Sequence, residues 1–131
     1  KSAAGYVRLG DAYREKGDRE NAMRAYEGAL GLEKENVAAL SRLAVVYGEM
    51  KEDGKALEAL KVLVKKVPGS PEVYYNVACL YSRHGQVDEA VKWLKVAMEK
   101  GFKDKELLAK DKDLENVRKS AWYKQLTAGG R

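Results

Sequence analysis

SPEVYYNVACLYSRHGQVDEAVKWLKVAMEKG, residues 70–101, is the stretch that decides the fold. Ser70 and Pro71 are typical of a helix start, because a hydroxyl can cap free N–H groups and proline suits the first helical position. Apolar residues then recur at three- and four-residue steps, as one face of a helix requires. Gly85 interrupts this pattern, a second apolar stripe follows, and Gly101 is placed as a C-terminal cap. The connection is so short that the stretch predicts two antiparallel helices, a helical hairpin.

The same pattern recurs at a spacing of 34 residues. Eight positions of the hairpin keep their size class in three copies, apart from Lys51 and Leu63. Small residues at matching positions let the two helices of a hairpin approach closely, and larger ones fill the space between hairpins. The structural repeat positions are Gly10, Tyr13, Ala22, Ala44, Tyr47, Ala56, Ala78, Tyr81 and Ala90.

A period of about 34 residues built from two helices resembles the tetratricopeptide repeat (TPR) family. The resemblance implies an all-α fold, a right-handed superhelical stack of antiparallel helix pairs (an α-solenoid). Three repeats are expected at residues 3–36, 37–70 and 71–104, followed by capping helices at 105–131, all in one domain. One hairpin cannot bury its own apolar face, so about three stacked copies are the practical minimum.

Composition agrees with a protein of amphipathic helices. Of the 131 residues, 34% are charged and 45% hydrophobic, and no apolar run approaches the ~20 residues that span a bilayer. A single cysteine excludes an internal disulfide and favours a reducing compartment, so the cytoplasm is weakly preferred. Without an initiator methionine or a signal-peptide pattern, the chain is expected to be part of a longer protein.

The pattern changes after Gly101. Short helices are expected around residues 105–110 and from Leu114, with a further turn around 122–126. Asp111, Asp113, Leu114, Val117, Arg118 and Tyr123 resemble a segment that often closes TPR arrays. Its expected role is to cover the third repeat with Leu107, Leu108, Leu114, Trp122 and Leu126. No such cap precedes Ala3, so further repeats upstream or self-association through the N-terminal face are expected.

Catalytic and metal-binding patterns are absent from the sequence. His84 is the only histidine, and Cys79 lies five residues before it, which turns the two side chains about 140° apart on a helix. They cannot form a local nucleophile–base pair. One cysteine and one histidine cannot complete a zinc site, and the glycines follow helix ends rather than a phosphate loop. We therefore expect no enzyme, no metal and no cofactor.

The remaining candidate site is a surface. The resemblance implies that the first helix of each repeat lines a concave groove, where arginine, tyrosine and asparagine can hold a peptide. Arg42 and Tyr75 are the expected anchors. A groove that is merely solvated is the alternative, because such arrays also bind through their edges or backs. The predicted peptide-binding residues are Arg8, Asp11, Arg42, Val45, Tyr75, Asn76, Cys79 and Arg83.

The expected partner is a protein or peptide. The family's clamp for chaperone C-terminal tails needs lysine, asparagine and arginine at five set positions, and Val7, Asp11, Arg42, Glu72 and Asn76 match none of them.

An RNA-binding module of the pentatricopeptide kind is the alternative, although its period is one residue longer and its inner face more basic. The tail carries nine basic and five acidic residues from 100 to 131, but interspersed acids argue against a nucleic-acid stripe around Trp122 and Tyr123. No membrane partner is expected.

Overall fold

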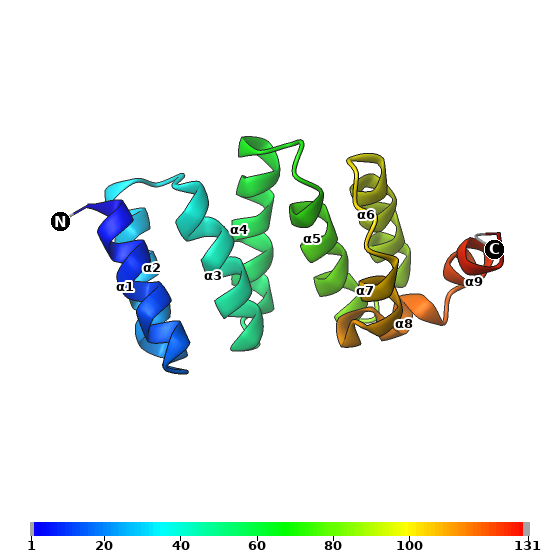
Figure 1. Cartoon of the computed structure of the whole chain (residues 1–131), viewed down its shortest axis with the longest axis horizontal. Coiled ribbons are helices and arrows are strands. Elements are labelled where there is room, and N and C mark those ends of the chain that lie inside the picture. The colour runs from blue at the N-terminus through cyan, green and yellow to red at the C-terminus, as the bar shows by residue number, and fades with distance from the viewer. Residues whose placement is uncertain (1, 130–131) are drawn as a thin grey trace. The chain divides into compact units, whose positions relative to one another are not determined.

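The computed structural model describes residues 2–129, and all their regular elements are helical (Figure 1). The chain divides into two compact units, residues 1–68 and 69–131. The first unit contains α1 (Ala3–Glu15), α2 (Arg19–Leu32), α3 (Val37–Glu49) and α4 (Asp53–Lys66). The second contains α5 (Pro71–Arg83), α6 (Val87–Glu99), α7 (Lys105–Lys110), the 3-10 helix η1 (Lys112–Leu114), α8 (Glu115–Arg118) and α9 (Ala121–Gly129).

Three helical hairpins form where the repeated pattern predicts them. Helices α1 and α2, α3 and α4, and α5 and α6 pack as pairs, and α2 also packs on α3 within the first unit. Ala22, Ala56 and Ala90 are fully buried where the paired helices meet. At Gly10 the approach is so close that an added Cβ would lie 2.5 Å from the ring of Tyr26. Small side chains thus set the distance between the helices of a pair. The division into repeats at residues 36, 70 and 104 stays a prediction.

The turns inside the hairpins share one backbone conformation. Gly17 and Gly85 have φ values of 82° and 77°, in the left-handed region that glycine enters without strain. Lys51 occupies the matching position of the second hairpin with a φ of 64°. The second turn therefore places a side chain where the other two have none.

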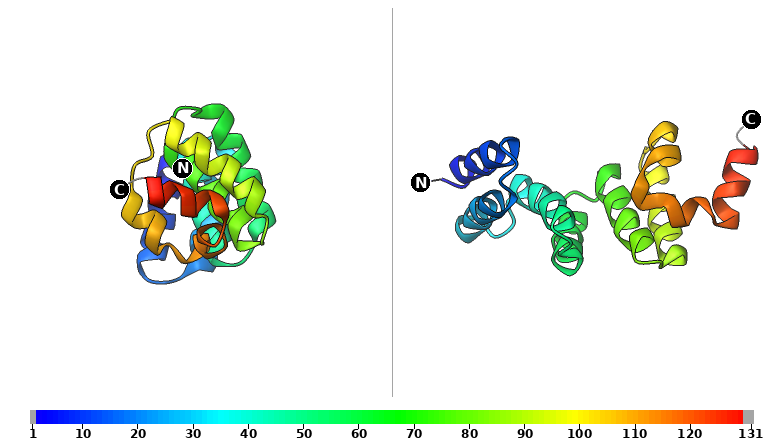
Figure 2. Two further views of the ribbon diagram at one scale, coloured as in Figure 1. Left: turned by 90° about the vertical axis from the view of Figure 1, so that its right-hand side faces the viewer. Right: turned by 90° about the horizontal axis from the view of Figure 1, so that it is seen from below.

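The segment after α6 packs against the third hairpin. Figure 2 shows η1 and α8 beside α5 and α6 within the second unit, and contacts between these elements agree. Leu108, Leu114 and Val117 are buried there, with Phe102 from the preceding loop. Leu107 is 39% exposed, so the expectation that it covers the hairpin is wrong. Trp122 and Leu126 are only partly buried, because α9 packs most closely on α8.

Candidate interaction surfaces

In the first unit, α1 and α3 present charged side chains that pair with one another. Arg42 Nε lies 2.7 Å from Asp11 Oδ1, which joins α3 to α1. Glu49 of α3 is shared by two arginines: its Oε2 lies 3.3 Å from Arg14 Nη2, and its Oε1 lies 3.1 Å from Arg19 Nε. The face between these helices is therefore held together by ion pairs, each only partly exposed.

Asp11 also contacts a tyrosine of α2. The hydroxyl of the fully buried Tyr26 donates a hydrogen bond to Asp11 Oδ1. Burial, and then this hydrogen bond to a carboxylate, raise the pKa of Tyr26 to about 12. With Tyr26 below and Arg42 beside it, the Asp11 carboxylate positions α1 against α3. Arg8 and Val45 stand three residues from Asp11 and Arg42 on their helices, and both are exposed, Val45 by 41%.

In the second unit, the matching face of α5 is covered. Tyr75 is 5% exposed, its hydroxyl donates to Asp111 Oδ2, and its ring stacks on Phe102 with centroids 4.5 Å apart. The Cys79 thiol, 7% exposed, lies 3.8 Å from the same Asp111 oxygen. Burial above all, and then contact with Asp111, raise the pKa of both Tyr75 and Cys79.

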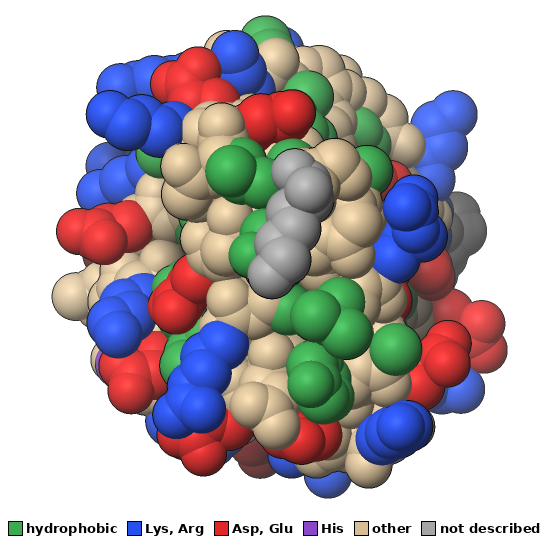
Figure 3. Space-filling view, turned by 90° about the vertical axis from the view of Figure 1, so that its left-hand side faces the viewer, with side chains coloured by type: hydrophobic (Ala, Val, Ile, Leu, Met, Phe, Trp, Pro, Cys, Tyr) green, Lys and Arg blue, Asp and Glu red, His purple; other side chains and the backbone are tan. Residues whose placement is uncertain are grey.

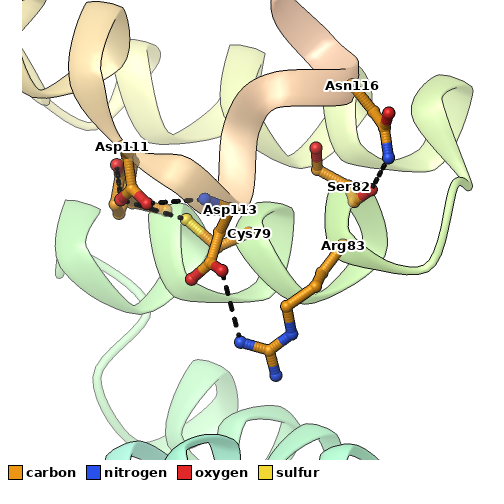
Figure 4. A network of polar contacts seen from close by, with 7 residues as sticks. Cys79, Ser82, Arg83, Asp111, Asp113 and Asn116 are labelled. Carbon is orange, nitrogen blue, oxygen red and sulfur yellow. Dashed lines mark hydrogen bonds and ion pairs between the residues drawn. The ribbon is translucent and has the colours of Figure 1, made fainter.

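These contacts correct the expectation that Tyr75 and Cys79 line an open groove. The segment from α7 to α8 lies over them, as Figure 4 shows for Cys79 and its neighbours. Of the other residues predicted on α5, Asn76 is half-buried and Arg83 pairs with Asp113 at 3.4 Å. Sequence reasoning identified Asp111 as part of a closing segment but did not reveal that its carboxylate contacts Tyr75.

One further hydrogen bond joins the segment to α5, and two others hold the segment itself together. Asn116 Nδ2 donates to the carbonyl of Ser82 at 2.8 Å (Figure 4). Arg118 Nη1 donates to the carbonyls of Leu108 and Asp111, at 2.9 and 2.7 Å. We call residues 105–118 the cap, because they close the α5 face by direct polar contacts as well as by apolar burial.

The thiol of Cys79 and the carboxylates of Asp111 and Asp113 come within 4.8 Å of one another. Each carboxylate already has partners: Asp111 accepts from Tyr75 and from the backbone N–H of Asp113, and Asp113 pairs with Arg83. These three side chains are therefore explained by the contacts that hold the cap on α5. A high pKa also makes this thiol a poor nucleophile.

A third surface lies on α1, on the side facing away from α3. Leu9 is 46% exposed and lines a hollow of about 200 Å³ together with Ser2, Gly5 and Tyr6. Figure 3 shows hydrophobic side chains gathered on this N-terminal face. The residue one repeat later is Leu43, which is fully buried in the unit where α2 packs on α3. The face of α3 that is equivalent by the repeat is therefore buried against a neighbouring helix, whereas this face of α1 is exposed.

Profiles of the tetratricopeptide repeat match residues 13–75 and 71–99, which together are more than half of the chain. The chain belongs to the tetratricopeptide repeat family. This confirms the family expected from the 34-residue period, and the all-α TPR solenoid fold is confirmed with it.

Several proteins are similar to a large part of the chain. The photosystem I assembly protein Ycf3 of Synechococcus sp. (strain CC9605) is 28% identical over 92 residues, which cover 68% of this chain and 53% of that protein. A chloroplastic protein of Arabidopsis thaliana is 36% identical over 69 residues, covering 50% of this chain and 21% of that protein. The crystal structure of MamA matches with a TM-score of 0.73 at 34% identity, covering 76% of this chain and 58% of that one. The chain therefore corresponds to part of each relative.

The repeats and these relatives support a protein–protein interaction scaffold. Within residues 2–129, no helix combines the length and apolar character needed to cross a membrane.

Proposed function

We propose that this TPR chain is an assembly scaffold that holds a segment of a partner protein on the face formed by α1 and α3. The name of the relative Ycf3 describes assembly, and we extend that general role, without its photosystem, to this chain. The partner segment would carry acidic and apolar side chains. Its carboxylates would approach Arg8 and Arg42, and an apolar group would cover the exposed Val45.

The observation that carries this proposal is the cap. In the third hairpin, Tyr75, Cys79 and Arg83 contact Asp111 and Asp113 of the cap. That face of a hairpin can therefore hold a polypeptide segment.

The residues 34 positions before Tyr75, Cys79 and Arg83 are Ser41, Val45 and Glu49 on α3. Those one repeat earlier again are Val7, Asp11 and Glu15 on α1. At these positions the first unit leaves Val45 exposed. The acids Glu49 and Glu15 stand where the cap meets Arg83, and the Cys79 position carries Val45 on α3 and Asp11 on α1, so a ligand there cannot be a copy of the cap. It must use the neighbouring arginines instead, which favours an internal acidic segment over a clamped carboxyl terminus.

A capture experiment tests the proposal. Partners are first isolated with the domain and identified by mass spectrometry. The double variant Arg8→Glu with Val45→Asp should then weaken binding about tenfold or more, which is about 1.4 kcal/mol. Both side chains are exposed and lie outside the Asp11–Arg42 pair, so helicity and melting temperature should stay unchanged.

The matched control changes the net charge by the same amount on another helix. Lys61→Glu with Lys65→Gln alters two exposed residues of α4 and should leave binding nearly intact. Loss of binding in the α4 variant alone would contradict the proposal.

A second proposal concerns the N-terminal face of α1. Leu9 is exposed beside the hollow, whereas the equivalent residue of the next repeat, Leu43 on α3, is buried. This face of α1 therefore suits a helix from a second copy of the chain. Leu9→Glu should then shift the sedimentation equilibrium toward monomer. Leu32→Glu, at a leucine 54% exposed at the end of α2, is the control that should leave it unchanged. A chain that is monomeric at all accessible concentrations contradicts this proposal.

A further inference from the structure

The second unit contains an apolar cleft that the proposed function does not use. It has a volume of about 520 Å³ and is bounded by the end of α6, by α7 and by α9. Met98, Leu108, Tyr123 and Leu126 supply most of its walls, with Lys105 among the residues that line it. The volume lies within the ~300–1,000 Å³ range of ligand pockets. The cleft is therefore large enough for several apolar side chains.

Helix α9 forms one wall but is attached at its beginning. Ser120 Oγ accepts from the backbone N–H of Tyr123 at 3.2 Å, and α9 packs most closely on α8. Figure 2 shows α9 joined to the rest of the second unit through α8. Its apolar residues Trp122, Tyr123 and Leu126 all remain partly exposed. An amphipathic helix in this position leaves its apolar side open toward α6 and α7.

Among the residues that line the cleft, the charged one is a lysine, Lys105. Of the nearby acids, Asp104 caps α7 by accepting from the N–H of Leu107 at 2.9 Å, and Glu106 pairs with Lys110 at 3.3 Å. Lys105 lines the cleft and Lys124 is exposed on α9. Residues 100–131 carry nine basic and five acidic side chains, two of the acids being Asp111 and Asp113 in the cap contacts. Because the lining residues include this lysine and neither aspartate nor glutamate, the cleft favours an acidic partner.

We propose that this cleft binds an acidic amphipathic helix of a partner protein, with its apolar side chains between α7 and α9 and its carboxylates near Lys105 and Lys124. A helix placed in an apolar groove is a common mode of peptide recognition. The walls are mostly aliphatic, with one tyrosine ring, which suits leucine-type side chains better than stacked bases. This second binding site is independent of the α1–α3 face and of its partner.

The test uses a fluorescently labelled synthetic helix of about 18 residues, five turns long, with leucine at i, i+3, i+4 and i+7 steps and glutamate elsewhere. Anisotropy should show that it binds, and that binding weakens as salt is raised. Lys105→Glu and Leu126→Ala should each weaken it roughly fivefold or more. Both side chains lie outside the fully buried core, so the fold should persist.

Two matched controls share the chemistry but lie outside the cleft. Lys112→Glu makes the same charge change on η1, and Leu107→Ala removes an exposed leucine of α7 that does not line the cleft. Both should bind within about twofold of the parent. Equal binding of a peptide with lysine in place of glutamate would overturn the proposal. So would insensitivity to Leu126→Ala, tighter binding of a single-stranded RNA, or self-association that Leu126→Ala abolishes, since that last result makes a second copy the occupant.

Discussion

Replacing Asp111 by alanine should release the cap from α5. The carboxylate accepts hydrogen bonds from the hydroxyl of Tyr75, from the thiol of Cys79 and from the backbone N–H of Asp113. Alanine removes all three at once, and it leaves the hydroxyl of a tyrosine that is 5% exposed without this acceptor.

The size of the effect follows from these contacts. A hydrogen bond between a buried hydroxyl and a charged group contributes about 1.5–3 kcal/mol. Asp111 is also the N-cap of η1, and loss of its side-chain acceptor there costs a further ~1 kcal/mol. Neighbouring contributions do not add fully, so the cap should be destabilised by about 2–4 kcal/mol. Each 1.4 kcal/mol changes an equilibrium constant tenfold. The population of molecules whose cap is detached from α5 should therefore rise roughly 30- to 1,000-fold.

Cys79 provides the assay, because it is the only cysteine and lies beneath the cap. When opening and reclosing are fast, the rate at which a disulfide reagent labels the thiol follows the open population. Asp111→Ala should therefore accelerate labelling by the factor above. Asp111→Asn should do so less, since an amide oxygen can still accept from Tyr75 and from the N–H of Asp113.

Asp113→Asn is the control. Its ion pair with Arg83 spans 3.4 Å and is partly exposed, and such pairs contribute about 0–1 kcal/mol. It should accelerate labelling by roughly fivefold or less. If Asp111→Ala labels no faster than Asp113→Asn, the carboxylate of Asp111 does not hold the cap and the reasoning fails.

Three further predictions concern the hairpins themselves. Lys51→Gly should raise the free energy of unfolding by about 0.5–1 kcal/mol in chemical denaturation, because the left-handed conformation strains a side chain; a less stable variant would contradict this. Ala90→Leu should lower it by about 1–3 kcal/mol through overpacking between α5 and α6, and a neutral result would mean that the contact is misplaced. Stability should fall as the pH rises from 10 to 12, and Tyr26 contributes to this fall because it ionises at about 12 when folded and near 10 when unfolded, so its protonated form stabilises the fold only below that range. The melting temperature of Tyr26→Phe should depend less on pH there, and equal slopes would exclude this residue as the cause.

Much of the fold could be predicted from the sequence, because each helix carries its own signals. Apolar spacing, Pro71 and the glycines that follow helix ends are local features, and the 34-residue repeat tests the apolar spacing three times. The short helix at residues 105–110 was predicted with the bounds that the structure has. Lys51 was noted as a departure from the repeat, but its positive φ comes from the conformation that the turn demands.

The candidate surfaces were harder to predict, because exposure depends on what other segments cover. Tyr75 occupies a groove position by helical geometry, and only the path of residues 105–118 decides that it is buried against Asp111. Asp11 and Arg42 were both predicted on the groove, but their pairing depends on the distance between α1 and α3. The sequence by itself determined the TPR family, the helices and their hairpins, since these follow from local periodicity. The tertiary structure alone decided which faces are covered and which charges are paired, and it alone revealed the cleft beside α9, because these depend on contacts between residues distant in the chain.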